Sequence, residues 1–149
     1  MTHSTKDYSK KENLKKTIKE LENFKKLENN EFKKLKNDLL NIFKNIKFIT
    51  PTYGNTINKN FIAIGNESKY KIPVFLNEKE YYEGLEFLNI KNKENYEQLS
   101  CSFDLFVNLA NNDKIFNGLI VNIASENIEI SRDILLQFIN EIKIKKCGT

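Results

Sequence analysis

Residues 115–139, IFNGLIVNIASENIEISRDILLQFI, decide the fold of this chain. Gly118–Ile123 is a short apolar run of mostly aliphatic and β-branched residues between turn-forming residues, which predicts a buried strand. The polar residues 124–127 predict a turn. Ile128–Ile130 then alternates between apolar and polar residues, as a half-buried strand does. The stretch therefore predicts two strands joined by a tight turn.

The rest of this stretch predicts a capped helix. Ser131 suits an N-cap, because its hydroxyl can accept a hydrogen bond from a free backbone N–H of the first helical turn. Asp133 adds a negative charge near that helix N-terminus, which the helix dipole favours. The apolar residues that follow have helical spacing and would form the buried face; they are Ile134, Leu135, Phe138, Ile139 and Ile142.

Two amphipathic helices are expected at the N-terminal end of the chain. Residues 12–28 have Leu14, Ile18 and Leu21 along one side and lysine and glutamate elsewhere, and residues 31–45 repeat the pattern. Between these helices and residue 115, strand-like and helix-like segments are interspersed. The expected elements are strands at 47–50, 60–64, 71–76 and 96–101, turns at 51–59 and 65–68, and helices at 78–88 and 103–110.

Local residue choices support several of these elements. Pro73 cannot donate to a β-ladder, so it is expected at a sheet edge or a bulge. Asn77 and Glu80 have the spacing of a capping box at a helix start. In the helix at 103–110, Leu105 is expected to face the core together with its apolar neighbours. The fold class is therefore α+β, with two N-terminal helices followed by a mixed, largely antiparallel sheet of about four to six strands packed with helices.

Composition and charge predict one globular domain. The 149 residues can bury a substantial core, and residues 12–142 are expected to form one domain between flexible segments at 1–11 and 143–149. No apolar run approaches the ~20 residues that span a bilayer, and the N-terminus lacks an apolar signal segment. With two cysteines and no disulfide framework, a cytoplasmic location without membrane contact is expected.

Four short motifs resemble the N-terminal domain family of SseB, the enhanced serine sensitivity type and not the secretion translocator of that name. Residues 72–77, IPVFLN, match an L-P-x-F-T-S segment, and residues 103–106 match a D-L-L helix. Residues 118–123 match a G-[IVL]-[VI]-[IVL]-N-P turn, and residues 130–133 match an L-x-R-E helix start. The matches fall in the family's order, but Leu76 and Ile123 replace a threonine and a proline. The resemblance implies a small domain whose name describes a phenotype and no reaction.

Several chemistries are not expected here. His3 is the only histidine and lies in the N-terminal segment, so a histidine-dependent nucleophile in the folded body is excluded. Cys101 and Cys147 are too few for a zinc site, and no phosphate-binding glycine loop is present. No catalytic residue, metal or cofactor is therefore predicted, and the chain is expected not to be an enzyme.

Acidic residues at helical positions leave one catalytic alternative open. Four glutamates between residues 78 and 86 are interpreted as a solvated helix face. A hydrolase that uses paired carboxylates would instead need two of them facing each other in a pocket. The four residues are Glu78, Glu80, Glu83 and Glu86.

A protein-binding role is the preferred hypothesis, with four candidate contact residues. Arg132 is the only arginine, and its rigid fork can bond carbonyls or a carboxylate, or else contact a partner. Asn122 can satisfy turn backbone groups or bind a ligand. Pro73 and Phe75 would lie at a strand edge, to which a partner strand could add if that edge is exposed. The partner, the oligomeric state and the strand order stay open.

The alternative is a weak nucleic-acid or anion binder that uses the basic N-terminal helices. Residues 1–46 have a net charge of +5, and residues 47–149 have a net charge of −1. Glutamates alternate with these lysines and the aromatic residues fall on the apolar side, so a solvated helix face is favoured over a nucleic-acid surface. The candidate basic residues are Lys15, Lys19, Lys26 and Lys33.

Overall fold

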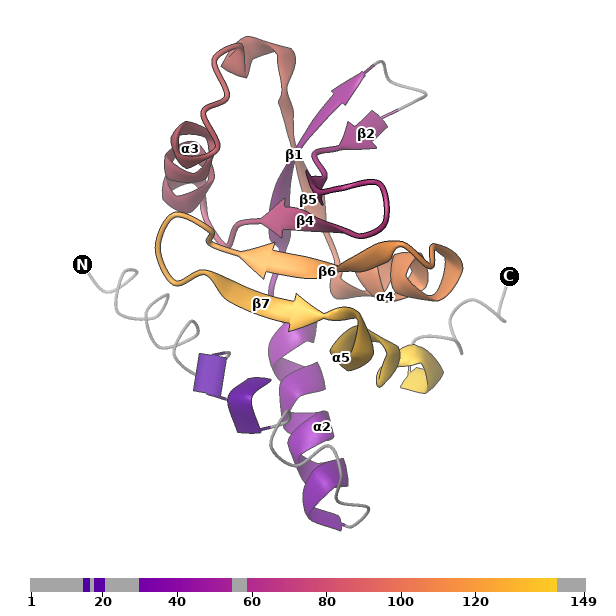
Figure 1. Cartoon of the computed structure of the whole chain (residues 1–149). Helices are drawn as coiled ribbons and strands as arrows, with labels where there is room; N and C mark the ends of the chain where they lie inside the picture. The colour runs from indigo at the N-terminus through magenta and orange to yellow at the C-terminus, as the bar shows by residue number, and fades with distance from the viewer. Residues whose placement is uncertain (1–14, 17, 21–29, 55–58, 142–149) are drawn as a thin grey trace, which may run out of the picture. The chain divides into compact units, whose positions relative to one another are not determined.

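The computed structural model describes residues 15–16, 18–20, 30–54 and 59–141 (Figure 1). The chain divides into two compact units, Met1–Asn45 and Ile46–Thr149. In the first unit, α2 (Asn30–Lys44) buries Leu39, Leu40 and Phe43, which have the spacing of one helix face. The expected helix at 12–28 lies mostly outside the described residues, so the pair of N-terminal helices stays a prediction.

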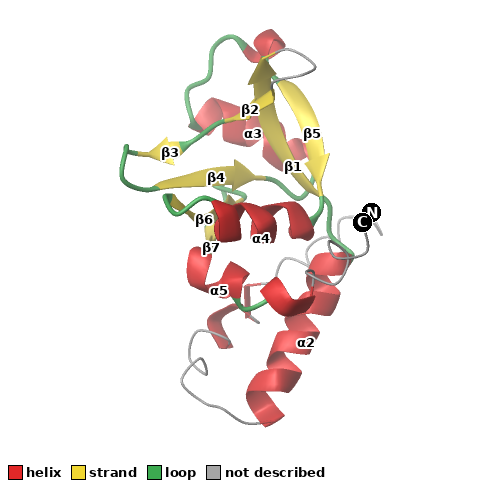
Figure 2. Ribbon diagram, turned by 90° about the vertical axis from the view of Figure 1, so that its right-hand side faces the viewer, coloured by secondary structure: helices red, strands yellow, loops and turns green. Residues whose placement is uncertain are grey.

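The second unit is α+β, as expected, and its strands form two sheets (Figures 1 and 2). The expectation of one sheet of four to six strands is wrong, because the described residues form seven strands in sheets of three and four. The parallel β4–β6 pair makes the pairing mixed, and the other pairs are antiparallel. The first sheet has the order β2 (Lys59–Phe61), β1 (Phe48–Gly54), β5 (Glu97–Cys101), and the second β3 (Ile64–Gly65), β4 (Tyr70–Val74), β6 (Phe116–Val121), β7 (Ile128–Ser131).

One isolated bridge joins the two sheets. Ile49 of β1 and Phe75, just after β4, exchange backbone hydrogen bonds of 2.8 and 2.7 Å. Beside this bridge, the Thr50 hydroxyl donates to the Pro73 carbonyl at 2.8 Å. The first sheet is therefore bonded directly to the end of β4.

The strand expected at 60–64 is divided between the two sheets. β2 ends at Phe61 and pairs with β1, whereas β3 begins at Ile64 and pairs with β4. The two residues between them, Ile62 and Ala63, connect the sheets. Apolar character alone could not reveal this division, because both halves are strands with different partners.

Both prolines lie within strands, as expected for Pro73 but not for Pro51. Pro51 was expected in a turn, but β1 continues through it to Gly54. The N–H and C=O groups of Ile49 bond to Phe75 and so point away from β5. In an antiparallel pair every second residue points its backbone groups the same way, so those of Pro51 also point away from β5. β2 begins to pair only at Thr52, so no strand requires the missing N–H of Pro51.

Pro73 was expected at an edge or a bulge, and the edge alternative is wrong because β4 lies between β3 and β6. β3 pairs only with Tyr70 and Lys71, and the register shift in β4 falls between Tyr70 and Ile72. The two-residue length of β3 explains why an inner strand tolerates a proline here.

Side chains of two helices contact opposite faces of the first sheet. On one face, Tyr81 and Leu85 of α3 (Glu78–Phe87) form a buried cluster with Phe75 and Ile49. On the other, Phe106 of α4 (Phe103–Asn112) contacts Phe48 and Phe61, with ring centroids 6.1 and 6.2 Å apart. The short helices η1 (Lys93–Asn95) and α5 (Arg132–Leu136) complete the described elements.

The expectation that Leu105 faces the core is wrong. The buried residues of α4 are Phe103, Phe106, Val107 and Ala110, the spacing of a single helix face. Leu105 lies off this face and is 40% exposed.

Candidate functional site

Asn122 lies where the parallel strands β4 and β6 end, the edge at which sheets of this kind often bind ligands. Its side-chain carbonyl accepts the Leu76 N–H at 3.2 Å, and its backbone N–H donates to Val74 at 2.9 Å. Asn122 is fully buried and has a positive φ of 52°. The residue thus bonds the end of the neighbouring strand through both its side chain and its backbone.

The turn after β6 is also organised by Asn122. Its carbonyl accepts the N–H groups of Ser125 and Asn127, at 3.0 and 2.9 Å. The predicted turn at 124–127 is confirmed. These bonds are the turn contacts expected for Asn122, and a ligand-binding role for it stays a prediction.

Glu80 is part of the same polar cluster, although the sequence placed it on a solvated helix face. Asn77 caps α3 by accepting the Glu80 N–H at 2.9 Å, as predicted. The Glu80 side chain is buried and accepts the Ser125 hydroxyl at 2.7 Å. Its neighbours Glu78 and Glu83 are exposed. The interpretation as a uniform solvated face is therefore wrong for Glu80, because α3 turns this residue toward the β6–β7 turn.

A second carboxylate approaches the same hydroxyl. Ser125 Oγ lies 3.0 Å from Glu126 Oε1 as well as 2.7 Å from Glu80 Oε1. A hydroxyl has a single proton, so it can fully satisfy only one carboxylate at a time. Among the described residues no three His, Cys, Asp or Glu side chains converge as metal ligands would. The cluster supplies hydrogen-bond donors and acceptors, and the bonds of Asn122, Asn77 and Ser125 serve the turn and the start of α3.

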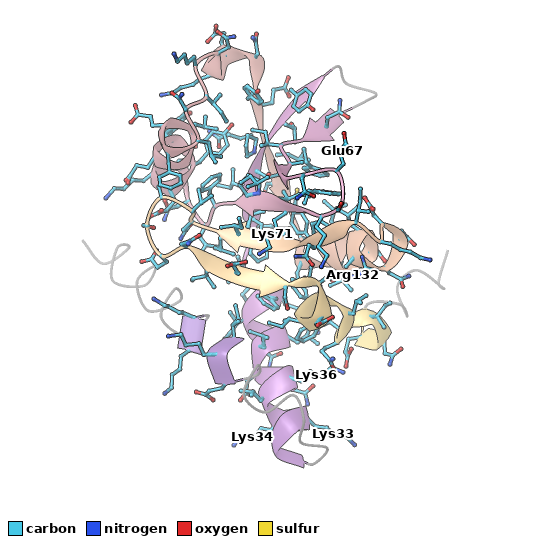
Figure 3. The ribbon with its side chains drawn as sticks, viewed as in Figure 1. Lys33, Lys34, Lys36, Glu67, Lys71 and Arg132 are labelled. Carbon is cyan, nitrogen blue, oxygen red and sulfur yellow. The ribbon has the colours of Figure 1, made fainter. Side chains whose placement is uncertain are left out.

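Arg132 bonds backbone carbonyls, which is the first of the two roles considered for it from the sequence. Its Nη1 donates to the carbonyls of Asp113 and Phe116, at 2.6 and 3.2 Å (Figure 3). Ser131, directly before it, caps α5 by accepting the Ile134 N–H at 3.3 Å, as predicted. Arg132 thus connects the start of α5 to the loop before β6, and a partner contact through it stays a prediction.

Tyr70 and Asp113 form a second bond to the same loop. The Tyr70 hydroxyl donates to Asp113 Oδ2 at 2.6 Å. This hydrogen bond is the largest influence that lowers the pKa of the Asp113 carboxyl below its ordinary value. Burial, and then the bond to Asp113, raises the pKa of Tyr70 well above its ordinary value. The pair therefore favours a charged Asp113 and a neutral Tyr70.

Three tyrosines lie on one face of the first sheet, outside the core. Tyr53 and Tyr96 pack edge to face with ring centroids 5.8 Å apart. Gln98, two residues along from Tyr96, donates from its side-chain amide to the Tyr82 hydroxyl of α3 at 3.1 Å. Tyr53 is 45% exposed and Tyr82 50% exposed. We call these four residues, Tyr53, Tyr82, Tyr96 and Gln98, the tyrosine face.

Pro73 and Phe75 do not lie at an open strand edge. Both residues are buried, Pro73 pairs with Ile120, and Phe75 exchanges backbone bonds with Ile49. The exposed edge that a partner strand would need is therefore absent at this segment. Cys101 is a buried free thiol, and burial raises its pKa to about 11.

The candidate lysines belong to the first unit of the chain. Lys19 and Lys33 are exposed, Lys15 is half-buried, and Lys26 lies outside the described residues. Figure 3 shows Lys33 along α2 together with Lys34, which is also exposed. Exposed lysines are compatible with both a solvated helix face and a nucleic-acid surface, so the nucleic-acid alternative stays a prediction.

The tyrosine face was not predicted from the sequence, although part of it could have been. With Tyr81 and Leu85 buried, helical periodicity puts Tyr82 on the outer side of α3. The contribution of Tyr53 could not be foreseen, because residues 51–59 were expected to be a turn.

No family model, no curated protein and no solved structure matches this chain. The resemblance to SseB stays a prediction. No helix in the described part of the chain has the length and apolar character needed to cross a membrane.

Proposed function

We propose that this chain is a non-enzymatic, SseB-like protein-binding domain of the cytosol, and that it contacts its partner through the tyrosine face. The observation that carries the proposal is the grouping of three tyrosines on one surface, where Tyr53 and Tyr82 are each about half exposed. Tyrosine is enriched at the centre of protein interfaces and among the residues that dominate binding energy. A ring that is apolar on its faces and polar at its hydroxyl suits such a contact.

The positions of these rings support the proposal, because ordered side chains lose less entropy on binding. Tyr82 is held by Gln98 and by the buried Tyr81, whose ring centroid lies 5.2 Å away. Tyr53 is held against Tyr96. A partner would therefore meet aromatic rings that already have defined neighbours.

The test is a pull-down from the native host with the tagged full chain, at low and high salt. The wild type is expected to retain a protein at high salt, and the double variant Tyr53→Ala/Tyr82→Ala is expected to lose it. Leu105→Ala is the matched control, because Leu105 is a similarly exposed apolar residue on a different helix, 40% exposed.

Two outcomes would overturn the proposal. Equal retention by the double variant would place the contact elsewhere. Retention of nucleic acid alone, lost at high salt, would assign the function to the basic residues such as Lys33, because phosphate contacts weaken steeply as salt rises.

A further inference from the structure

Among the residues that the structure describes, β5 is an edge strand of the first sheet. Its one strand neighbour there is β1, and its residues Glu97, Gln98 and Ser100 are exposed. An edge strand presents unpaired backbone N–H and C=O groups, which can bond to another strand.

The register identifies which backbone groups are open. Because the backbone groups of Ile49 bond to Phe75, they point away from β5. Ile49 and Ser100 are therefore a non-hydrogen-bonded pair, and the backbone groups of Ser100 point away from β1. The same alternation applies to Gln98, which is opposite Pro51. Among the described residues, the N–H and C=O groups of Gln98 and Ser100 therefore face outward from the sheet.

The outward-facing backbone groups of Gln98 and Ser100 can bond to the same groups in a second copy of β5. If two copies of β5 pair antiparallel around Leu99, Gln98 of one copy lies opposite Ser100 of the other. Both are outward-facing residues, so each such pair can exchange two backbone hydrogen bonds. Leu99 then lies opposite its own copy, and Glu97 lies opposite Cys101, so no like charges meet.

The other edge strands suit this pairing less well. β2 has three residues and β3 has two, which limits the ladder that either can add. β7 has four residues, and the exposed Glu129 in it is paired with Lys71. Natural edges are commonly protected by lysine, proline or an inward charge, and the sequence of β5, EQLSC, contains no lysine and no proline.

We propose that two copies of this chain form a symmetric dimer through β5, in which the two three-stranded sheets become one continuous sheet. The proposal rests on backbone groups at a strand edge and not on the tyrosine face. It therefore stands or fails separately from the proposed function.

The first experiment measures the mass of the full chain in solution by sedimentation velocity over a range of protein concentrations. The wild type is expected to reach twice the chain mass of 17.5 kDa. Ser100→Pro is expected to stay at the mass of one chain, because it removes only an N–H that points away from β1, a position where edge strands tolerate proline. Ser100→Ala, which keeps the N–H, is the matched control and is expected to form the dimer.

A second experiment tests the register in a Cys147→Ser background. Leu99→Cys is expected to form a disulfide-linked dimer on oxidation, because directly opposed residues of a non-hydrogen-bonded antiparallel pair have Cα atoms about 4.5 Å apart. Ser100→Cys is the control and is expected not to cross-link, because its own copy lies two residues further along the ladder.

Three outcomes would overturn the proposal. They are a wild-type chain that stays monomeric at every concentration, a dimer that survives Ser100→Pro, and a dimer in which Leu99→Cys fails to cross-link. If circular dichroism shows that Ser100→Pro is unfolded, Ser100→Lys takes its place, since a lysine at this exposed position opposes strand addition without touching the β1 ladder.

Discussion

The Asn122 side-chain carbonyl accepts the Leu76 N–H at 3.2 Å, so that the residue directly after β6 bonds the second residue after the end of β4. It does so in the left-handed backbone conformation, with a φ of 52°. Asparagine reaches this conformation more readily than most residues, because its short polar side chain can bond locally. The contact holds the start of α3 close to the β6–β7 turn, where Glu80 meets Ser125.

Replacing Asn122 by alanine is expected to lower the free energy of unfolding by about 2–4 kcal/mol. Roughly 1–3 kcal/mol comes from leaving the Leu76 N–H unsatisfied, and about 1 kcal/mol from placing alanine, which lacks the short polar side chain of asparagine, in the left-handed conformation. Urea unfolding followed by circular dichroism measures the change.

Asn127→Ala is the matched control for this prediction. Asn127 has the same φ of 52° but is exposed, and its backbone N–H bond to Asn122 survives the substitution. It should therefore lose only the conformational contribution, about 1 kcal/mol. Equal losses in the two variants would show that the bond to Leu76 contributes nothing.

Gly84→Ala is expected to destabilise the protein although alanine is the better helix former. A Cβ at this position would lie 2.1 Å from the ring of Phe75. Overpacking of this kind costs about 1–3 kcal/mol, which exceeds the gain of up to about 1 kcal/mol in helix propensity. Thermal or denaturant unfolding should show a net loss.

The clash can be relieved from the other side. Phe75→Leu removes the ring, so the double variant should lose less stability than the sum of the two single variants, with a coupling of about 0.5–3 kcal/mol. A Gly84→Ala protein that is more stable than the wild type would contradict this packing.

Tyr70→Phe is expected to raise the pKa of the Asp113 carboxyl toward its ordinary value. The hydrogen bond from Tyr70 is the largest influence that lowers this pKa, and phenylalanine cannot make it. NMR titration of the Asp113 carboxyl measures the shift. Tyr53→Phe, at an exposed tyrosine of the first sheet, should leave it unchanged.

The same pair predicts two effects of pH on stability. Because the pKa of Asp113 is lower when folded, its contribution is present above the unfolded value of about 3.9 and is lost as the pH falls through the folded pKa. Because the pKa of Tyr70 is higher when folded, its contribution is present below about pH 10 and is lost as the pH rises above it. Both dependences should shrink in Tyr70→Phe, and unchanged profiles would contradict the assignment.

Arg132→Ala is expected to lower the free energy of unfolding by about 1–2 kcal/mol. Hydrogen bonds from a charged donor contribute about 1.5–3 kcal/mol, and removing a cation from the first turn of α5 returns about 0.3–1 kcal/mol. The lost bonds are those to the carbonyls of Asp113 and Phe116.

Arg132→Lys separates the geometry from the charge. Lysine keeps the charge but lacks the planar fork, so it should recover only part of the lost stability. If denaturant unfolding shows full stability in both variants, Arg132 is not needed for the fold, and its candidate role as a contact residue gains weight.

Features that depend on near neighbours in the chain were predicted well. Asn77 and Ser131 cap helices as expected, because an N-cap needs only an oxygen placed two or three residues before a free N–H. The strand, turn, strand and helix of residues 115–139 were predicted in order. The boundaries of β6 are shifted by two residues, and α5 ends at Leu136 although the predicted helix continued through Phe138 and Ile139.

Features that depend on distant partners were not predicted. The sequence pattern does not distinguish Glu80 from the exposed glutamates around it, because its partner Ser125 is 45 residues away in the chain. The sequence of residues 60–64 does not tell which sheet each half joins. Pro51 is tolerated in β1 because it points away from β5 and because β2 begins to pair only at Thr52.

The sequence by itself determined the α+β class, the helix caps and the central strand–turn–strand–helix segment, because these follow from periodicity and from hydrogen bonds within a few residues. The tertiary structure alone decided that there are two sheets, that β4 and β6 are parallel, and that Tyr53 and Tyr82 share a surface. Strand order and surface neighbours are set by contacts between residues far apart in the chain. A local pattern of apolar and polar residues is compatible with several such pairings.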